Sequence, residues 1–262
     1  MSTIVVKFGG HAMSDEAGHF AQSIQSAIAA GHKVVVVHGG GPQINRALDT
    51  AGITSVFIGG FRVTTPEIFA VVERVLAREV GPAIAENLKS HGIAATALSG
   101  RDGIIFAVCQ KTLVNGDAVD LGRVGDVQRA EGDAVTAVLN SNAVPVISPI
   151  AQDIDSSEGL NVNADIAAAA IAGALSAQEL IIMTDVAGIY RAWPDTTSLI
   201  SAISVDELKS IKSTFAEGMA PKVQACIDAI DAGACAVRII DGRTPEPFAQ
   251  ALTGEGGTLV HL

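Results

Sequence analysis

Two lysines occupy places in the sequence where a positive charge can meet an anionic ligand. Lys7 ends an apolar segment and is closely followed by Gly9 and Gly10. Lys222 lies at the predicted start of a helix that runs to about Asp231. A cation at a helix N-terminus is electrostatically unfavourable unless an anion lies nearby. Two such lysines would offset the charge that develops during phosphoryl transfer, whereas the alternative for Lys7 is a lysine at a sheet margin whose ammonium reaches solvent.

A triple glycine, Gly39-Gly40-Gly41, follows the apolar segment 34–38. Glycine lets backbone N–H groups approach an anion, and the helix that follows adds a favourable dipole. The alternative is a tight strand–helix turn without a ligand. The turn matches neither common nucleotide motif, because GxxxxGK[ST] is absent and Ile44 replaces the last glycine of GxGxxG.

Two polar segments could complete a site for an acidic small molecule. Arg62 lies in a glycine-containing loop, and its guanidinium suits a carboxylate; a salt bridge across a helix start is the alternative. Asn161, Asn163 and Asp165 lie at the start of an alanine-rich helix, where Asn163 or Asp165 could act as the helix cap. One cap suffices, so the remaining polar groups are available to a ligand.

The composition excludes several classes of protein. The chain has 17 Lys and Arg against 28 Asp and Glu, a net charge of −11 that disfavours nucleic acid as a partner. Its 48% hydrophobic residues predict a folded core. The best apolar run, 166–175, is shorter than the roughly 20 residues that span a membrane. Three cysteines without a CxxC motif favour reduced thiols, no protein metal site and a cytoplasmic location.

Apolar segments that alternate with helical patterns predict an α/β fold with a mainly parallel sheet between helical layers. Ligands of such sheets bind at the carboxyl ends of the strands, where both glycine turns lie. We expect a β-hairpin with an Asn115-Gly116 turn and a helix that begins at Ser14 as N-cap. The predicted strands are 4–8, 34–38, 104–108, 118–124, 144–150, 180–183 and 237–240, and the predicted helices are 14–30, 42–50, 65–88 with a break near Gly81-Pro82, 165–175 and 222–231.

The motifs, taken in chain order, resemble those of the amino acid kinase family and, within it, the acetylglutamate kinases. Each segment alone is a weak signal, whereas their common order over nearly the whole chain is specific. The matching segments are 6–10, 38–42, 60–64, 120–126, 161–165, 184–189, 218–222 and 240–243.

The resemblance implies ATP-dependent phosphorylation of the side-chain carboxylate of N-acetyl-L-glutamate, the second step of arginine biosynthesis. It implies a three-layer αβα sandwich of two lobes, with residues 1–176 binding the amino acid and forming a homodimer, and residues 177–262 binding ATP. Mg²⁺ would be held mainly by the ATP phosphates. A start only a few residues before the first strand predicts a dimer without arginine control, because arginine-inhibited members carry an additional N-terminal helix.

The resemblance also implies a role for each motif residue. Lys7 and Lys222 would stabilise the transferred phosphoryl group, and Asp165 would hold both lysines. Gly40, Gly41, Arg62 and Asn161 would bind the substrate. The nucleotide would contact Gly9, Gly10, Asp185, Val186, Ala187, Gly188, Ile189, Tyr190, Thr214, Phe215 and Ala216; Trp193 could line the adenine pocket with Tyr190 or serve only in packing.

Two alternatives share this fold. A sibling kinase would act on an acetylated or carrier-linked 2-aminoadipate in lysine biosynthesis, and the segment 60–65 favours acetylglutamate over it. A catalytically silent amino-acid sensor could lose either lysine without penalty, so the presence of both Lys7 and Lys222 favours an enzyme.

Overall fold

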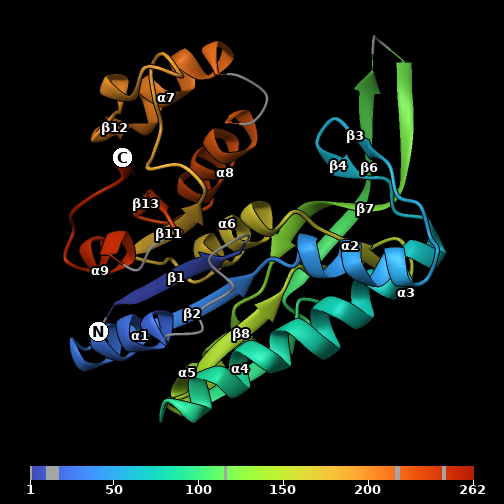
Figure 1. Ribbon diagram of the computed structural model, residues 1–262, viewed down its shortest axis with the longest axis horizontal. Helices are drawn as coiled ribbons and strands as arrows, with labels where there is room; N and C mark the ends of the chain where they lie inside the picture. Colours follow the sequence, from blue (N-terminus) through green and yellow to red (C-terminus); the bar gives the residue numbers. More distant parts are fainter. Residues whose placement is uncertain (1, 10–17, 115–116, 216–218, 244–245) are drawn as a thin grey trace.

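A central eight-stranded sheet organises the chain in the computed structural model, which describes residues 2–9, 18–114, 117–215, 219–243 and 246–262 (Figure 1). The strand order is β12-β14-β13-β11-β1-β2-β8-β5, and every neighbouring pair is parallel except β13 and β14. The strands are β1 (Thr3–Phe8), β2 (Lys33–His38), β5 (Ala95–Ser99), β8 (Val144–Ser148), β11 (Glu179–Thr184), β12 (Ala202–Ser204), β13 (Ala236–Asp241) and β14 (Thr258–His261).

Helices cover both faces of this sheet because its strands are apolar on both sides. In β1, Val5 belongs to one buried cluster, whereas Ile4 and Val6 belong to the cluster on the opposite face. The expected three-layer αβα sandwich is therefore confirmed. The first face carries α5 (Asp133–Asn140), α6 (Ala164–Ala174), α7 (Val205–Ile211) and α8 (Ala220–Asp231), and the second carries α1 (His19–Ala29), α4 (Gly81–Ser90) and α9 (Glu246–Leu252).

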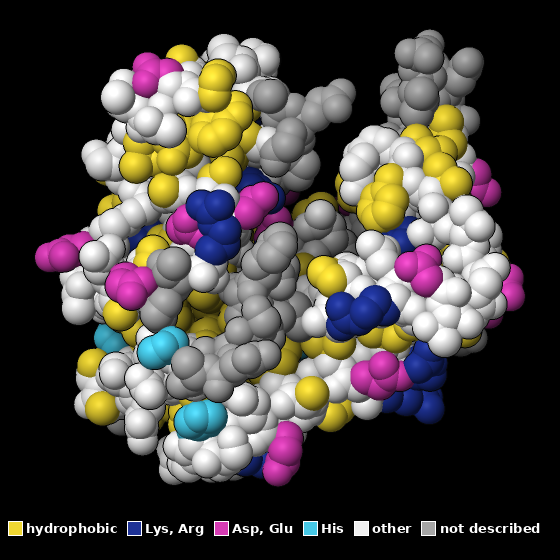
Figure 2. Space-filling model, viewed as in Figure 1, with side chains coloured by type: hydrophobic (Ala, Val, Ile, Leu, Met, Phe, Trp, Pro, Cys, Tyr) yellow, Lys and Arg dark blue, Asp and Glu magenta, His cyan; other side chains and the backbone are white. Residues whose placement is uncertain are grey.

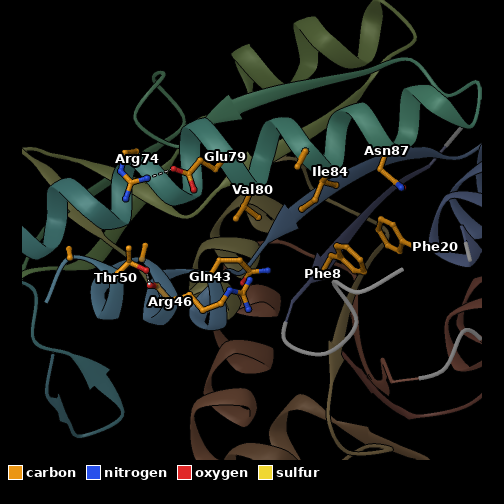
Figure 3. A pocket seen from close by; sticks show the side chains of 13 residues that line it. Phe8, Phe20, Gln43, Arg46, Thr50, Arg74, Glu79, Val80, Ile84 and Asn87 are labelled. Atoms are coloured by element: carbon orange, nitrogen blue, oxygen red, sulfur yellow. Dashed lines mark hydrogen bonds and ion pairs between the residues drawn. The ribbon is translucent and has the colours of Figure 1, made fainter. Parts of the chain in front are cut away.

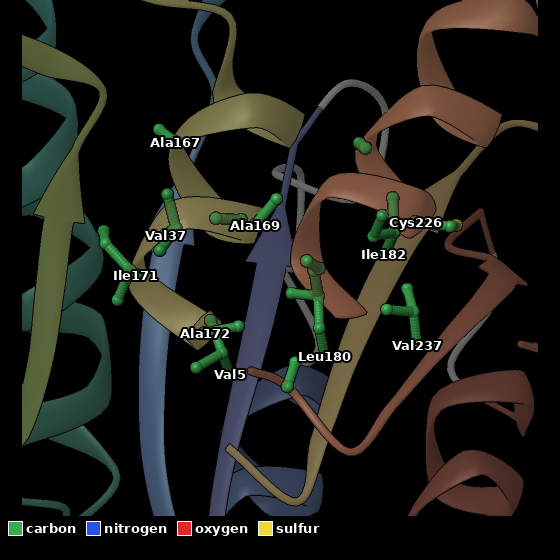
Figure 4. Close-up of a cluster of buried hydrophobic side chains, with 14 of the residues drawn as sticks. Val5, Val37, Ala167, Ala169, Ile171, Ala172, Leu180, Ile182, Cys226 and Val237 are labelled. Carbon is green, nitrogen blue, oxygen red and sulfur yellow. The ribbon is translucent and has the colours of Figure 1, made fainter. Parts of the chain in front are cut away.

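The alanine-rich helix α6 lies close to both the sheet and α8 (Figure 4). Ala167, Ala169 and Ala172 are buried, and a Cβ on Gly173 would collide with Ala232 at the end of α8. Small side chains are what permit this approach. Asn163 caps the helix, since its Oδ1 accepts a hydrogen bond from the backbone N–H of Asp165 at 2.8 Å. The cap is thus Asn163, and the side chain of Asp165 is left for another role.

The first helix begins later than the sequence predicts. α1 starts at His19, and Gly18 precedes it in the left-handed region with φ of 71°. Glycine adopts this conformation without steric cost, so Gly18 rather than a serine cap marks the helix start. The predicted cap, Ser14, lies outside the described residues.

The long helix predicted over 65–88 is not broken at Gly81-Pro82. Its irregularity comes one turn earlier, where the Gly81 N–H donates to the carbonyl of Leu76 in π-helical geometry. A proline ring crowds the carbonyl four residues before it, and the wider π turn preceding Pro82 makes room for the ring. The segment consists of α3 (Pro66–Glu73), the π-helical turn Arg74–Val80 and α4.

The remaining strands build the region above α2 and α3 in Figure 1. The strand predicted over 144–150 divides at Pro149, and the predicted hairpin is longer than expected, while its turn at 115–116 lies outside the described residues. β6 (Ile105–Val114), β7 (Asp117–Ala130), β9 (Ile150–Asp153) and β10 (Gly159–Asn161) pair as a small closed barrel, β3 (Phe57–Ile58) pairs with β4 (Phe61–Arg62), and α2 spans Gly41–Thr50.

Within the described ranges, no helix is both long enough and apolar enough to cross a bilayer.

Candidate active site

The carboxyl ends of four parallel strands bring the predicted motifs to one edge of the sheet. Phe8 of β1 is paired with His38 of β2, and the Gly39 N–H donates to the Phe8 carbonyl at 2.8 Å. On the other side of β1, β11 ends at Thr184, whose carbonyl accepts a hydrogen bond from the Gly242 N–H at 2.7 Å. The described face is hollowed near this edge, with charged side chains gathered beside the hollow (Figure 2). The glycine turns and the segment after β11 therefore adjoin one crevice.

An ion pair between Lys7 and Asp165 lies at the centre of this edge. Lys7 Nζ is 3.0 Å from Asp165 Oδ1 and donates to the Met183 carbonyl at 3.3 Å, and the two side chains are only 13% and 8% exposed. Among the described residues, Asp165 Oδ1 accepts no hydrogen bond, and its charge is balanced by the ion pair with the Lys7 ammonium. Asp165 lies in the first turn of α6, where the helix dipole also favours a carboxylate. A Cβ on Gly9 would lie 3.3 Å from Lys7 Cε, so glycine leaves room for the lysine.

A cavity of about 220 Å³ lies beside the triple-glycine turn. Arg62 lines it and is 7% exposed; its Nη1 donates to Ser55 Oγ at 2.5 Å, and its Nη2 donates to Asn45 Oδ1 at 2.6 Å. Burial lowers the pKa of the Arg62 guanidinium, which nevertheless stays charged at neutral pH. The wall combines one cation, backbone amides and carboxamides, the groups that bind a small carboxylic acid. Its residues include Gly39, Gly40, Gly41, Phe57, Arg62, Asn161 and Asn163.

Thr64 joins the Arg62 loop to the barrel and to Asn161. Its N–H donates to the Leu121 carbonyl at 2.9 Å, and its Oγ1 accepts from Asn161 Nδ2 at 3.3 Å. Gly122 approaches so closely, with φ of 67°, that a Cβ there would collide with the Thr64 carbonyl. The matching segment 120–126 therefore serves the site indirectly, because it fixes the loop that carries Arg62.

A second cavity of about 440 Å³ lies beyond the end of β11. Tyr190 and Trp193 meet edge to face with ring centroids 5.1 Å apart, and Trp193 is 62% exposed. The Thr184 hydroxyl donates to Asp185 at 3.0 Å and lowers the pKa of that carboxyl, with smaller contributions from the charges of Lys222 and Arg243. Aromatic rings and cations in one cavity suit a nucleobase and its phosphates. The lining comprises Asp185, Val186, Tyr190, Arg191, Ala192, Trp193, Thr214, Phe215, Met219 and Lys222.

His38 holds the first peptide of the triple-glycine turn. It is fully buried, and its Nδ1 lies 2.7 Å from the Gly39 carbonyl oxygen, so the ring is protonated at Nδ1. Burial lowers the pKa of His38 to about 4, which keeps the ring neutral at pH 7. Next to it, a Cβ on Gly40 would collide with Leu76 of the π-helical turn. The π turn therefore packs directly behind the glycines.

A larger cavity, about 750 Å³, lies between α2 and the helical segment formed by the π-helical turn and α4 (Figure 3). Phe8 and Phe20 lie at one end, and the Arg74–Glu79 ion pair lies at the other. Among the described residues, it shares no lining residue with the Arg62 cavity, and no predicted site residue lines it.

Ten of the predicted site residues line one of the two smaller cavities, whereas Lys7, Gly9 and Asp165 line neither. Asp165 pairs with Lys7, but the described residues show no ion pair between Asp165 and Lys222. Ile189 is buried, with its N–H donating to Thr258 Oγ1, and does not line the nucleotide-sized cavity. Gly10 and Ala216 lie outside the described residues. The first cavity contains Gly40, Gly41, Arg62 and Asn161, and the second contains Asp185, Val186, Tyr190, Thr214, Phe215 and Lys222, whereas Ala187 and Gly188 line neither.

Sequence reasoning missed the two hydrogen-bond partners of Arg62. Asn45 is 17 positions and Ser55 is 7 positions from Arg62, and they belong to different elements. No local spacing rule connects such residues, so only the folded chain identifies them. Met219 was likewise not assigned to the second cavity, although it lies in the matching segment 218–222.

Comparison with known proteins identifies the family. The sequence pattern of the amino acid kinase family matches residues 2–241. An acetylglutamate kinase from Salinispora tropica is 46% identical over 264 residues, covering 99% of this chain and 89% of that protein. Another from Leifsonia xyli subsp. xyli is 48% identical over 244 residues, covering 92% and 81%. An N-acetylglutamate synthase structure from Neisseria gonorrhoeae has a TM-score of 0.82 at 21% identity; the match covers this whole chain and 59% of that one, and shows the fold alone. The chain belongs to the amino acid kinase family.

Proposed function

We propose that the chain transfers the γ-phosphoryl group of ATP to the side-chain carboxylate of N-acetyl-L-glutamate, giving N-acetyl-L-glutamyl 5-phosphate in arginine biosynthesis. The observation that carries the proposal is the place of Lys7. It lies at the end of β1, and β1 is flanked by β2, which leads to the Arg62 cavity, and β11, which leads to the Lys222 cavity. Relatives 46% and 48% identical to the chain are acetylglutamate kinases.

The reaction needs charge neutralisation more than proton transfer. The attacking carboxylate is already ionised at neutral pH, so no general base is required. Its oxygen forms a bond to the γ-phosphorus while the bond from that phosphorus to the bridging oxygen breaks, and ADP leaves with the electron pair. Lys7 and Lys222 stabilise the negative charge on the transferred group, and the Gly40 and Gly41 N–H groups donate to its oxygens or to the substrate.

The remaining residues bind and orient. Arg62 and Asn161 hold the α-carboxylate and neighbouring polar groups of the substrate, and Asp165 fixes the ammonium of Lys7. The second cavity offers aromatic side chains for adenine and Lys222 for phosphate. Mg²⁺ would be held mainly through the ATP phosphates, where it would neutralise phosphate charge.

We further propose that the protein acts in the cytoplasm as a homodimer of two-lobed subunits. Residues 1–176 form the lobe that binds the acetylated amino acid and carries the dimer contacts, and residues 177–262 form the lobe that binds ATP. Strands from the two segments occupy opposite halves of the sheet, in support of this division. Light scattering coupled to gel filtration measures the mass of the assembly.

Trapping of the acyl phosphate with hydroxylamine tests the activity. Hydroxamate should form with ATP and N-acetyl-L-glutamate, at a higher kcat/KM than with N-acetyl-L-2-aminoadipate. A preference for the aminoadipate compound would assign the chain to the sibling reaction. An absence of hydroxamate with every acidic amino-acid derivative would instead support a sensor that lacks catalysis.

A further inference from the structure

The guanidinium of Arg62 is buried without an acidic partner, which sets it apart from the other arginines of the described chain. Arg238 is buried to a similar extent, 4% against 7% exposed, but its Nε lies 2.6 Å from Glu179 Oε1. A buried charge is costly unless an opposite charge and hydrogen bonds compensate it. Ion pairs with Asp or Glu are also formed by Arg74, Arg101, Arg123, Arg129, Arg191 and Arg243.

Two neutral side chains hold this guanidinium in place. Asn45 Oδ1 of α2 accepts from Nη2 at 2.6 Å, and Ser55 Oγ of the loop before β3 accepts from Nη1 at 2.5 Å. The Phe57 ring covers the group, with Cζ 4.6 Å from the ring centroid. These contacts fix the orientation of Arg62 but remove none of its charge.

From this arrangement we propose that Asn45 and Ser55 are positioning residues that reserve the charge of Arg62 for the substrate. They make the site specific for acidic derivatives with a free α-carboxylate, and they select against derivatives in which that carboxylate is an amide. An aspartate in place of Asn45 would form an ion pair with the Arg62 guanidinium and neutralise its charge. The inference rests on the proposed function, in which Arg62 binds the α-carboxylate of the substrate, and it adds the two residues that position Arg62 for this contact.

The cavity itself supports this assignment. No Asp or Glu is among its described lining residues, whereas Gly40, Gly41 and Asn161 add hydrogen-bond donors. A carboxylate bound there would supply the anion that Arg62 lacks, and it would displace none of the present contacts of Arg62. Loss of the charge should therefore weaken substrate binding more than turnover, because this carboxylate takes no part in phosphoryl transfer.

The test compares N-acetyl-L-glutamate with its α-carboxamide, since both retain the side-chain carboxylate that is phosphorylated. The wild-type protein should prefer the α-carboxylate by at least about tenfold in kcat/KM. Asn45→Asp should raise KM for N-acetyl-L-glutamate at least about tenfold, change kcat by less than about threefold, and remove most of the preference. Ser55→Ala, a smaller change that keeps the charge, should raise KM a few-fold and leave the preference largely intact.

Asn140→Asp is the matched control. It makes the same chemical change beside a cation, because Asn140 Oδ1 accepts from Lys33 Nζ at 3.1 Å, but it lies at the end of α5 outside the site. It should leave KM and the preference unchanged. Circular dichroism and thermal unfolding verify that each variant is folded; if Asn45→Asp is not, a wild-type KM for Ser55→Ala overturns the proposal.

The outcomes separate this inference from the proposed function. If the wild-type protein forms hydroxamate and Asn45→Asp keeps the wild-type KM and preference, the inference is wrong and the function stands. If no hydroxamate forms, calorimetric titration of the two ligands into wild type and Asn45→Asp decides. The inference is supported without the activity if the wild-type protein binds N-acetyl-L-glutamate more tightly than its α-carboxamide and Asn45→Asp does not. It is overturned if the wild-type protein binds the two ligands equally or not at all, or if Asn45→Asp keeps the wild-type selectivity.

Discussion

Lys7 Nζ lies 3.0 Å from Asp165 Oδ1, which joins the end of the central strand β1 to the first turn of α6. Both side chains are largely buried, and neither residue lies near the other in sequence. The pair fixes an ammonium at the edge of the sheet between the two cavities. In the proposed reaction, this ammonium faces the transferred phosphoryl group.

Replacement of the carboxylate in this pair should impair turnover. Asp165→Asn keeps the shape of the side chain but no longer compensates or orients the Lys7 ammonium. We expect kcat to fall by about 10²-fold, the size of effect typical for loss of preorganised charge stabilisation, with a smaller change in KM. Steady-state kinetics with N-acetyl-L-glutamate measure this, and an unchanged kcat would show that the pair has only a structural role.

Lys222→Ala should lower turnover far more than nucleotide affinity, because the main contact of Lys222 is expected in the transition state. Trp193 is the only tryptophan in the chain and lines the same cavity, so its fluorescence can report nucleotide binding. Lys209→Ala is the control, since Lys209 is an exposed lysine that pairs with Asp231 on α8. A Lys222→Ala protein with a wild-type rate would remove this lysine from the mechanism.

The triple-glycine turn should tolerate a methyl group at one position but not at its neighbour. A Cβ on Gly40 would collide with the buried side chain of Leu76, whereas a Cβ on Gly41 would have no described atom within 4 Å. Gly40→Ala should therefore lower the free energy of unfolding by roughly 1–3 kcal/mol, and Gly41→Ala should lower it much less. Urea unfolding measures both changes.

A second substitution tests the cause of this loss. Leu76→Ala removes the side chain that a methyl group at Gly40 would strike, so the double variant should be more stable than the two separate effects predict. Purely additive effects would contradict the collision.

His38 should make the protein sensitive to mild acid. Its folded-state pKa of about 4 lies below the ordinary 6.5, so the unfolded chain binds the proton first as pH falls. The free energy of unfolding therefore falls between about pH 6.5 and 4. The decrease caused by His38 amounts to about 2 kcal/mol at pH 5. Urea unfolding at pH 7 and pH 5 should show a smaller decrease for His38→Gln than for wild type, with exposed His261→Gln as the matched control. An equal decrease in His38→Gln and wild type would exclude this role.

Local chemistry by itself determined much of this protein. Continuous runs of Val and Ile identified strands covered on both faces, and the glycine turn after β2 predicted the sheet edge at which Lys7 and Asp165 lie. The alanines of α6 predicted close packing against the sheet, which the buried Ala167 and Ala169 confirm. These features depend on neighbours within a few residues, so periodicity and composition suffice to read them.

Only the tertiary structure decided which distant groups meet. Asn45 and Ser55 became the partners of Arg62 because the fold brings α2 and the loop before β3 to the Arg62 guanidinium, and nothing in their local sequence marks them. Likewise, Gly81-Pro82 predicted a break in the long helix, but packing retained a continuous helix with a π turn. Hydrogen bonds and burial between remote segments depend on the fold of the whole chain, so no local pattern specifies that Arg62 is buried between two neutral partners.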